Sequence, residues 1–175
     1  MKFKYLPHTA DAKFVAYGKS IDEVFANSAL AMFNILGKTD GVKVTKKIKI
    51  HLNGKNYENL LYNFLEELIF LLETENLFLS NIKNLKIGKD FSLSCIVEGD
   101  NLNKYDLKSD IKAVTYSDMK ISKTDKGYNA VVVIDIWKMK IKKISENVYE
   151  VDKEDCMNVP VKIFASEKIL DKIKK

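Results

Sequence analysis

The chain contains no arginine, so all 29 of its basic residues are lysines. Arginine supplies the forked hydrogen bonds that read base edges in nucleic acids, and lysine does not reproduce that geometry. Residues 1–136 carry 19 lysines against 17 acidic residues, and residues 137–175 carry 10 lysines against 7. The main body is therefore close to neutral despite the net charge of +5. We expect no direct base-specific binding of nucleic acid.

Cysteine is scarce and long apolar runs are missing. Cys95 and Cys156 are far apart and form no metal-binding or disulfide pattern, so we expect two free thiols. The apolar stretches are short and broken by Glu or Lys, which predicts no membrane span. The first residues, 1–8, lack the apolar core of a signal peptide. A cytoplasmic location is the expectation that follows.

Signatures of catalysis are also missing. The sequence has no glycine-rich phosphate loop, no Cys/His spacing for zinc and no Ser-His-Asp order. Of the two histidines, His51 shares one face of a predicted strand with the polar residues Lys49 and Asn53, and it is expected at the surface. His8 belongs to Pro7-His8-Thr9-Ala10-Asp11, where the residues alone favour a turn with Asp11 bonded to local backbone. The residues alone therefore indicate no catalytic reaction.

Two helices stand out from the hydrophobic spacing. Ser20 and Glu23 form a capping box at the start of the first helix, whose apolar residues recur at helical spacing until Gly37 ends it. The second helix, 57–75, has apolar residues over far more than a narrow stripe, which predicts that it is mostly buried. We expect Glu66, Glu67 and Glu73 to lie on its solvent side.

The remaining pattern is that of strands. Alternating or continuous apolar residues predict strands over 14–17, 42–52, 78–87, 91–97, 111–116 and 131–136. Residues 131–134 have no polar alternation, which indicates a central strand buried on both faces. The predicted order of elements is strand, helix, strand, helix and then several strands. This order favours an α+β fold, with two helices packed on an antiparallel or mixed sheet.

Asp135 is the residue with the clearest chemical question. It follows four consecutive apolar residues, and a carboxylate at the end of a buried strand is costly unless it is paired or bound to a metal. It could emerge into solvent as the strand ends, or it could be a ligand of a hard cation such as Ca²⁺ or Mg²⁺. The residues alone leave these two alternatives open.

Several motifs, in this order, are similar to those of the archease family. They are His8-Thr9-Ala10-Asp11, Tyr17-Gly18, Phe25-Ala26-Asn27, Leu60-Leu61-Tyr62-Asn63-Phe64-Leu65-Glu66-Glu67-Leu68, Ile111-Lys112-Ala113-Val114-Thr115-Tyr116 and Val132-Val133-Ile134-Asp135-Ile136. Each motif is weak alone, but together they span about 1–136. The chain therefore resembles an archease over most of its length.

The resemblance implies a function. Archeases are accessory proteins that activate the RtcB-type tRNA-splicing RNA ligase, promote guanylylation of its active-site histidine, allow multiple turnover and can broaden its nucleotide choice. An alternative within the same resemblance is a general chaperone or modulator of tRNA-modifying enzymes. A metal-dependent hydrolase is a third reading, but the sequence offers it no nucleophile and base pair.

The resemblance also implies a metal site. The positions that match the ligands of the family are the side chains of Asp11 and Asp135 and the main-chain oxygen of Ile136. The ion is a divalent cation, and we expect Ca²⁺. Family members typically end at the position of Ile136, whereas Trp137 follows here. Ile136 then offers a neutral carbonyl in place of a carboxylate, and we expect weaker binding of the cation.

The C-terminal region is unusual for this family. We expect an archease-like domain over 1–136, a linker over 137–143 and an extension over 144–175. The extension contains Met157-Asn158-Val159-Pro160 and resembles the N-terminus of the RtcB-type ligase, although it lacks every metal ligand of the ligase. The alternative is an unrelated extension with a strand at 161–165 and a short helix capped by Ser166.

Overall fold

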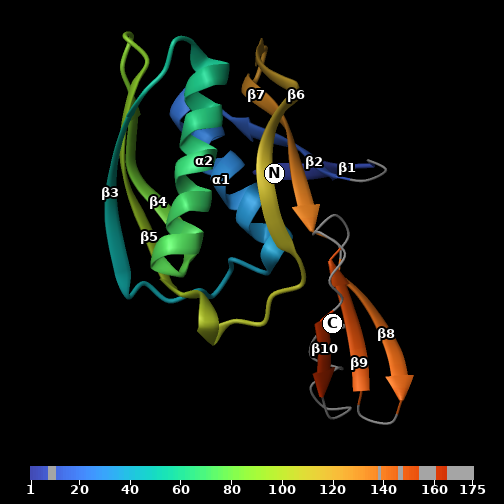
Figure 1. The fold of residues 1–175 in the computed structure, drawn as a ribbon. Helices are drawn as coiled ribbons and strands as arrows, with labels where there is room; N and C mark the ends of the chain where they lie inside the picture. Colours follow the sequence, from blue (N-terminus) through green and yellow to red (C-terminus); the bar gives the residue numbers. More distant parts are fainter. Residues whose placement is uncertain (8–10, 138, 146–147, 154–160, 165–175) are drawn as a thin grey trace.

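Two helices lie between two antiparallel sheets in the computed structural model (Figure 1). The structure describes residues 1–7, 11–137, 139–145, 148–153 and 161–164, and it describes side chains for 1–7 and 11–137. This arrangement is the predicted α+β fold. Its sheets are antiparallel throughout the described residues, so the antiparallel alternative of the prediction is the correct one.

The first sheet has four strands in the order β1-β2-β7-β6. They are β1 (Phe3–Leu6), β2 (Ala12–Gly18), β7 (Gly127–Trp137) and β6 (Asp110–Thr124). Strand β7 has a neighbour on each side, and residues 132–134 within it are buried. The central position predicted from the unbroken apolar run is confirmed.

The second sheet has three strands in the order β3-β5-β4. They are β3 (Lys46–Asn53), β5 (Ser92–Asn101) and β4 (Leu77–Ile87). The strand predicted over 42–52 begins only at Lys46, so the first part of that prediction is wrong. Val42 lies in the loop before β3 and is nevertheless buried. Its apolar side chain therefore extended the alternating pattern of β3 toward the N-terminus, although its backbone is not in the strand.

Helix α1 (Ile21–Leu36) begins where the capping box was predicted. The Ser20 hydroxyl accepts a hydrogen bond from the Glu23 N–H at 3.2 Å. The Glu23 carboxylate accepts from the N–H of Lys19 at 2.8 Å, one residue before the usual partner in a capping box. The N–H of Gly37 donates to the Phe33 carbonyl and closes the other end.

The burial of α1 goes beyond the single apolar face that its spacing predicts. The helix contacts strands of both sheets, so its polar residues Asn27 and Ser28 are buried as well. The Asn27 amide donates to the Tyr17 carbonyl at 2.7 Å, and the Ser28 hydroxyl donates to the Val24 carbonyl at 2.8 Å. These bonds remove the cost of burying the two side chains.

Helix α2 (Tyr57–Glu75) has the bounds that the sequence predicts. Its first turn is capped by the side chain of Asn56, which accepts from the Asn59 N–H at 2.8 Å. It ends at Asn76, which adopts the left-handed conformation with φ 49°. Neither described helix is long and apolar enough to cross a membrane.

Two glutamates of α2 bind the edge strand β6, which corrects the sequence-based placement of Glu66 on the solvent side. Glu66 Oε1 accepts from the Val114 N–H at 3.1 Å, and Glu58 Oε1 accepts from the Ile121 N–H at 3.1 Å. Glu73 is exposed, as predicted. An edge strand has N–H groups without a strand partner, and here the helix supplies acceptors for two of them.

A separate three-stranded sheet follows the main body, in the order β10-β9-β8. It consists of β8 (Met139–Ser145), β9 (Val148–Lys153) and β10 (Val161–Phe164). The expected linker therefore includes the first part of β8, and β10 lies within the strand expected at 161–165. The expected helix at Ser166 and the Met157–Pro160 stretch lie outside the described residues. The division into domains stays a prediction.

Candidate functional site

The register between β2 and β7 brings the two predicted aspartates to the same end of the sheet. Ala12 pairs with Ile134, the last pair of this ladder. Asp11 immediately precedes Ala12 and Asp135 immediately follows Ile134, so both aspartates adjoin the same cross-strand pair. Opposite Cα atoms of an antiparallel ladder are about 4.5–5.5 Å apart. Residues more than a hundred positions apart in sequence thus meet at one place in the fold.

A bulge in β6 adds a lysine to this end of the sheet. Ile111 pairs with Ile136 and Ala113 pairs with Asp135, which leaves Lys112 as an extra residue between two consecutive pairs. Bulges re-aim side chains. Here Lys112 Nζ lies 3.3 Å from Asp135 Oδ2, with about a third of each side chain exposed.

The same lysine also contacts the residue that follows the predicted metal ligands. Lys112 Nζ lies 4.6 Å from the centre of the Trp137 ring, within range of a cation–π interaction. Trp137 in turn pairs with Asp110, the first residue of β6. Lys112 and Asp110 were not predicted as site residues. Lys112 lies within the predicted strand over 111–116, and no sequence signal locates the bulge.

Asp135 is partly exposed, as the first of the two alternatives supposed, and it also pairs with the ammonium of Lys112. The second alternative, a ligand of a hard cation, stays a prediction. The donors available here are carboxylate and carbonyl oxygens, the ligand types that Ca²⁺ prefers. Among the described residues no group of three or more His, Cys, Asp or Glu side chains is arranged to hold a metal. His8, Thr9 and Ala10 lie outside the described residues.

These residues fit a hard cation in kind but not in number. A Ca²⁺ ion takes six to eight oxygens, as a rule, so Asp11, Asp135 and the Ile136 carbonyl would need water or further protein oxygens beside them. Strand β7 continues through Ile136 to Trp137, so Ile136 contributes no terminal carboxylate. The part of this sheet end that the structure describes thus offers oxygen ligands from two chain segments.

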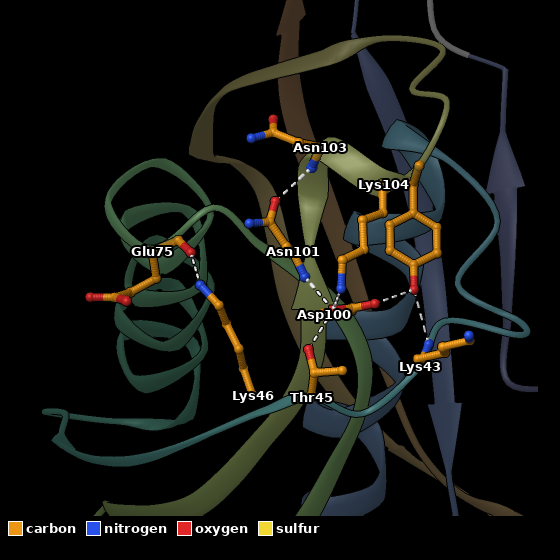
Figure 2. Close-up of polar contacts among 9 residues, drawn as sticks. Lys43, Thr45, Lys46, Glu75, Asp100, Asn101, Asn103 and Lys104 are labelled. Carbon is orange, nitrogen blue, oxygen red and sulfur yellow. Dashed lines mark hydrogen bonds and ion pairs between the residues drawn. The ribbon is translucent and has the colours of Figure 1, made fainter.

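A second polar cluster surrounds the buried carboxylate of Asp100 (Figure 2). The Lys104 ammonium, 2.8 Å away, and the Thr45 hydroxyl are the main causes that hold the pKa of this carboxyl well below its usual range. Tyr105 donates to the carboxylate at 3.0 Å and accepts from the Lys43 N–H at 3.0 Å.

The position of this cluster gives it a structural role. Asp100 lies in β5, and Lys104 belongs to the short 3₁₀ helix η1 (Leu102–Lys104). Thr45 belongs to the loop that precedes β3, and Lys46 on β3 donates to the Glu75 carbonyl at the end of α2 (Figure 2). The Asp100 cluster therefore ties three segments together.

The fold and site define a small α+β protein with two helices between antiparallel sheets and acidic residues at one sheet end. Residues 3–136 match the family model described as the Archease protein family, and the chain belongs to this family. The predicted family resemblance is confirmed. The match ends at residue 136, so residues 137–175 lie beyond it.

Individual relatives agree with this assignment. The chain is 36% identical over 140 residues to Protein archease of Methanosarcina mazei, covering 77% of this chain and 96% of the relative. It is 36% identical over 144 residues to Protein archease-like of Drosophila melanogaster, covering 78% and 91%. The solution structure of Methanobacterium thermoautotrophicum protein 1598 superposes with a TM-score of 0.65 at 32% identity, covering 77% and 98%.

Proposed function

We propose that this chain is a non-enzymatic activator of an RtcB-type tRNA-splicing RNA ligase. In this role it promotes guanylylation of the active-site histidine of the ligase, allows multiple turnover and broadens the choice of nucleotide. Membership of the archease family is the observation that carries the proposal.

We further propose that a divalent cation, Ca²⁺, is held by Asp11, Asp135 and the carbonyl of Ile136. The meeting of β2 and β7 at the Ala12–Ile134 pair supports this assignment. A bound cation would neutralise the carboxylates and fix the ends of the two strands. The residues themselves present oxygen ligands from two chain segments, so the site depends on the intact sheet.

A turnover assay tests the activator role. Ligase, GTP and Mn²⁺ are mixed with a large excess of broken RNA, with and without this protein. We expect several ligated products per ligase only when the protein is present. A single product per ligase in both reactions would contradict the proposal. Repeating the assay with ATP tests the broadened choice of nucleotide.

Variants of the two aspartates test whether the sheet end carries the activity. Asp11→Asn and Asp135→Asn keep the shape of each side chain and remove its charge, and we expect each to reduce turnover to the level without activator. Asp125→Asn is the matched control, because Asp125 is exposed in the turn between β6 and β7, away from the start of β2. Loss of activity in the control as well would argue against a specific site.

The alternative role as a general chaperone makes a different prediction. A chaperone suppresses the aggregation of unrelated proteins, whereas a dedicated activator leaves that aggregation unchanged. Light scattering of a heat-denatured client protein, with and without this chain, separates the two. Suppression of aggregation without any effect on ligation would favour the chaperone.

The extension over 144–175 is proposed to be a ligase-like segment that holds the activator near its client. A tether raises the effective concentration of one partner near the other. The support is the sequence resemblance of the extension to the N-terminus of the ligase. The coding sequence downstream of Lys175 tests the idea, because a ligase-like reading frame is expected nearby and its absence would count against a fusion.

A further inference from the structure

The outward face of the β3-β5-β4 sheet carries a cluster of positive charge. On β3, Ile50 is buried toward the helices, so the alternating residues Lys49 and His51 point away from them, and both are exposed. Lys83 and Lys86 on β4 are exposed and pair with β5 residues of the same face. We call the following set the basic platform: Lys49, His51, Lys83, Lys86, Ser94 and Ile96.

The pairing of the strands orders the platform into two rows. One row runs from Lys49 across Ile96 to Lys83, and the next runs from His51 across Ser94 to Lys86. Neighbouring strands are about 4.8 Å apart and alternate residues along a strand are about 6.6 Å apart. The basic residues therefore surround a small neutral centre within an area of about 10 by 7 Å.

Acidic residues do little to neutralise the platform. Strands β3 and β4 contain none. Glu98 on β5 lies one row further along and pairs with Lys47 at 2.9 Å. The carboxylate of Asp90, in the turn before β5, accepts from the Ser92 hydroxyl at 2.7 Å and from the Ser92 N–H. The platform keeps a net positive charge that a polyanion would complement.

The chemistry of the platform favours a phosphate backbone over other polyanions. Its one ring is the imidazole of His51. It has no Phe, Tyr or Trp on which a base could stack and no arginine to read a base edge. Ile96 is its one apolar side chain, and protein interfaces depend on larger apolar or aromatic anchors. Rows of lysines match the sequence-independent contacts made to a nucleic acid duplex.

A hollow beside the platform favours RNA over DNA. It has a volume of about 490 Å³. Leu52, Ile87 and Leu93 form an apolar part of its lining, and its polar part consists of Asn53, Ser92 and Ser94 together with His51 and Lys86. Hydroxyl and amide groups can bond the 2′-hydroxyl that RNA presents and DNA lacks, and duplex RNA is recognised through its 2′-hydroxyls and phosphates. We propose that the outward face of the β3-β5-β4 sheet binds the sugar–phosphate backbone of double-stranded RNA without reading its sequence.

Binding is measured on the full chain by fluorescence anisotropy, with a labelled RNA hairpin and no ligase. Failure of this test therefore leaves the activator role standing, and failure of the turnover assay leaves RNA binding standing. Three lysine–phosphate contacts give a log–log salt slope of about −2.7, so affinity should fall about 40-fold between about 50 and 200 mM salt. A salt-independent affinity, or no binding at 50 mM, overturns the proposal.

Charge variants locate the binding face. Lys49→Gln with Lys83→Gln should weaken binding and reduce the fall over the same salt range to about threefold, because about one contact remains. Lys123→Gln with Lys126→Gln is the control of equal charge, placed on exposed residues at the β6–β7 turn, and it should keep the steep slope. Circular dichroism confirms that both variants fold. If the two double variants lose RNA affinity equally, the assignment of RNA binding to the basic platform is overturned.

Competitor molecules test the kind of partner. Duplex DNA of the same sequence should compete more weakly than duplex RNA, because it lacks the 2′-hydroxyl. Equal competition by DNA overturns the choice of RNA. Polyglutamate that competes as well as RNA, with the same dependence on the platform lysines, would show a surface for acidic proteins instead.

Discussion

Lys112 Nζ lies 3.3 Å from Asp135 Oδ2, so a lysine of the protein already contacts one carboxylate of the proposed cation site. The bulge in β6 and the ring of Trp137, 4.6 Å from the same ammonium, hold the lysine there. A bound Ca²⁺ ion and this ammonium would repel each other. At the proposed site, Lys112 would therefore compete with the cation and weaken its binding.

Removing the charge of Lys112 should strengthen cation binding. Two unit charges 4 Å apart interact by about 1 kcal/mol in water, and more for a divalent ion, so Lys112→Gln should tighten Ca²⁺ binding by about fivefold or more. Isothermal titration calorimetry measures the dissociation constant. Lys126→Gln, at an exposed turn position, controls for net charge and should change it little. An unchanged dissociation constant in Lys112→Gln would show that the lysine does not compete.

The local parts of the fold could be predicted from the sequence, and the long-range parts could not. The bounds of α2 follow from the apolar pattern within the segment itself. The short edge strand β1 carries no such signal and was not predicted. The burial of Asn27 and Ser28 depends on α1 lying between two sheets, which no periodicity within the helix reveals.

The candidate site shows the same division. Asp135 could be singled out because it follows a buried strand, but Asp11 was linked to it only through the family resemblance. The register of β2 on β7 supplies the physical connection. Lys112 could not be found, because an irregular pairing between β6 and β7 determines where its side chain points.

Acid should destabilise the protein through Asp100. Its neighbours hold its pKa below the ordinary value of 3.8, so its contribution to stability is present above that value. The contribution is lost as the pH falls below about 4 toward the lower pKa of the folded state. Asp100→Asn should lower the melting temperature at pH 7 and flatten the fall in melting temperature between about pH 5 and 2.

Asp90→Asn is the comparison for this experiment. The Asp90 carboxyl also has a lowered pKa, because of its hydrogen bonds from Ser92, but it lies in an exposed turn. We expect a smaller change in the melting curve, since solvent replaces those bonds readily. If the melting temperature of Asp100→Asn falls with acid as steeply as that of the parent protein, Asp100 is not the cause of the acid destabilisation.

The bond from β6 to Glu66 should contribute measurably to stability. Glu66→Ala leaves the Val114 N–H without its acceptor, and Val114 is only 4% exposed. The expected loss is about 1–3 kcal/mol in the free energy of unfolding, the cost of an unsatisfied buried donor. Urea unfolding measures it. Glu73→Ala, on the exposed side of the same helix, should change stability by less than about 0.5 kcal/mol.

Cys95 should be chemically inert in the folded protein. Its side chain is buried on β5, confirming the predicted free thiol there, and burial raises the pKa of the thiol to about 11. Only the thiolate reacts with disulfide reagents, so about one thiol in a thousand is reactive at pH 8. Cys156, which lies outside the described residues, is replaced by serine to isolate the signal. Cys156→Ser protein should then react with an aromatic disulfide only slowly in buffer and rapidly in concentrated urea. Equal rates in both solutions would show that the core around Cys95 opens freely.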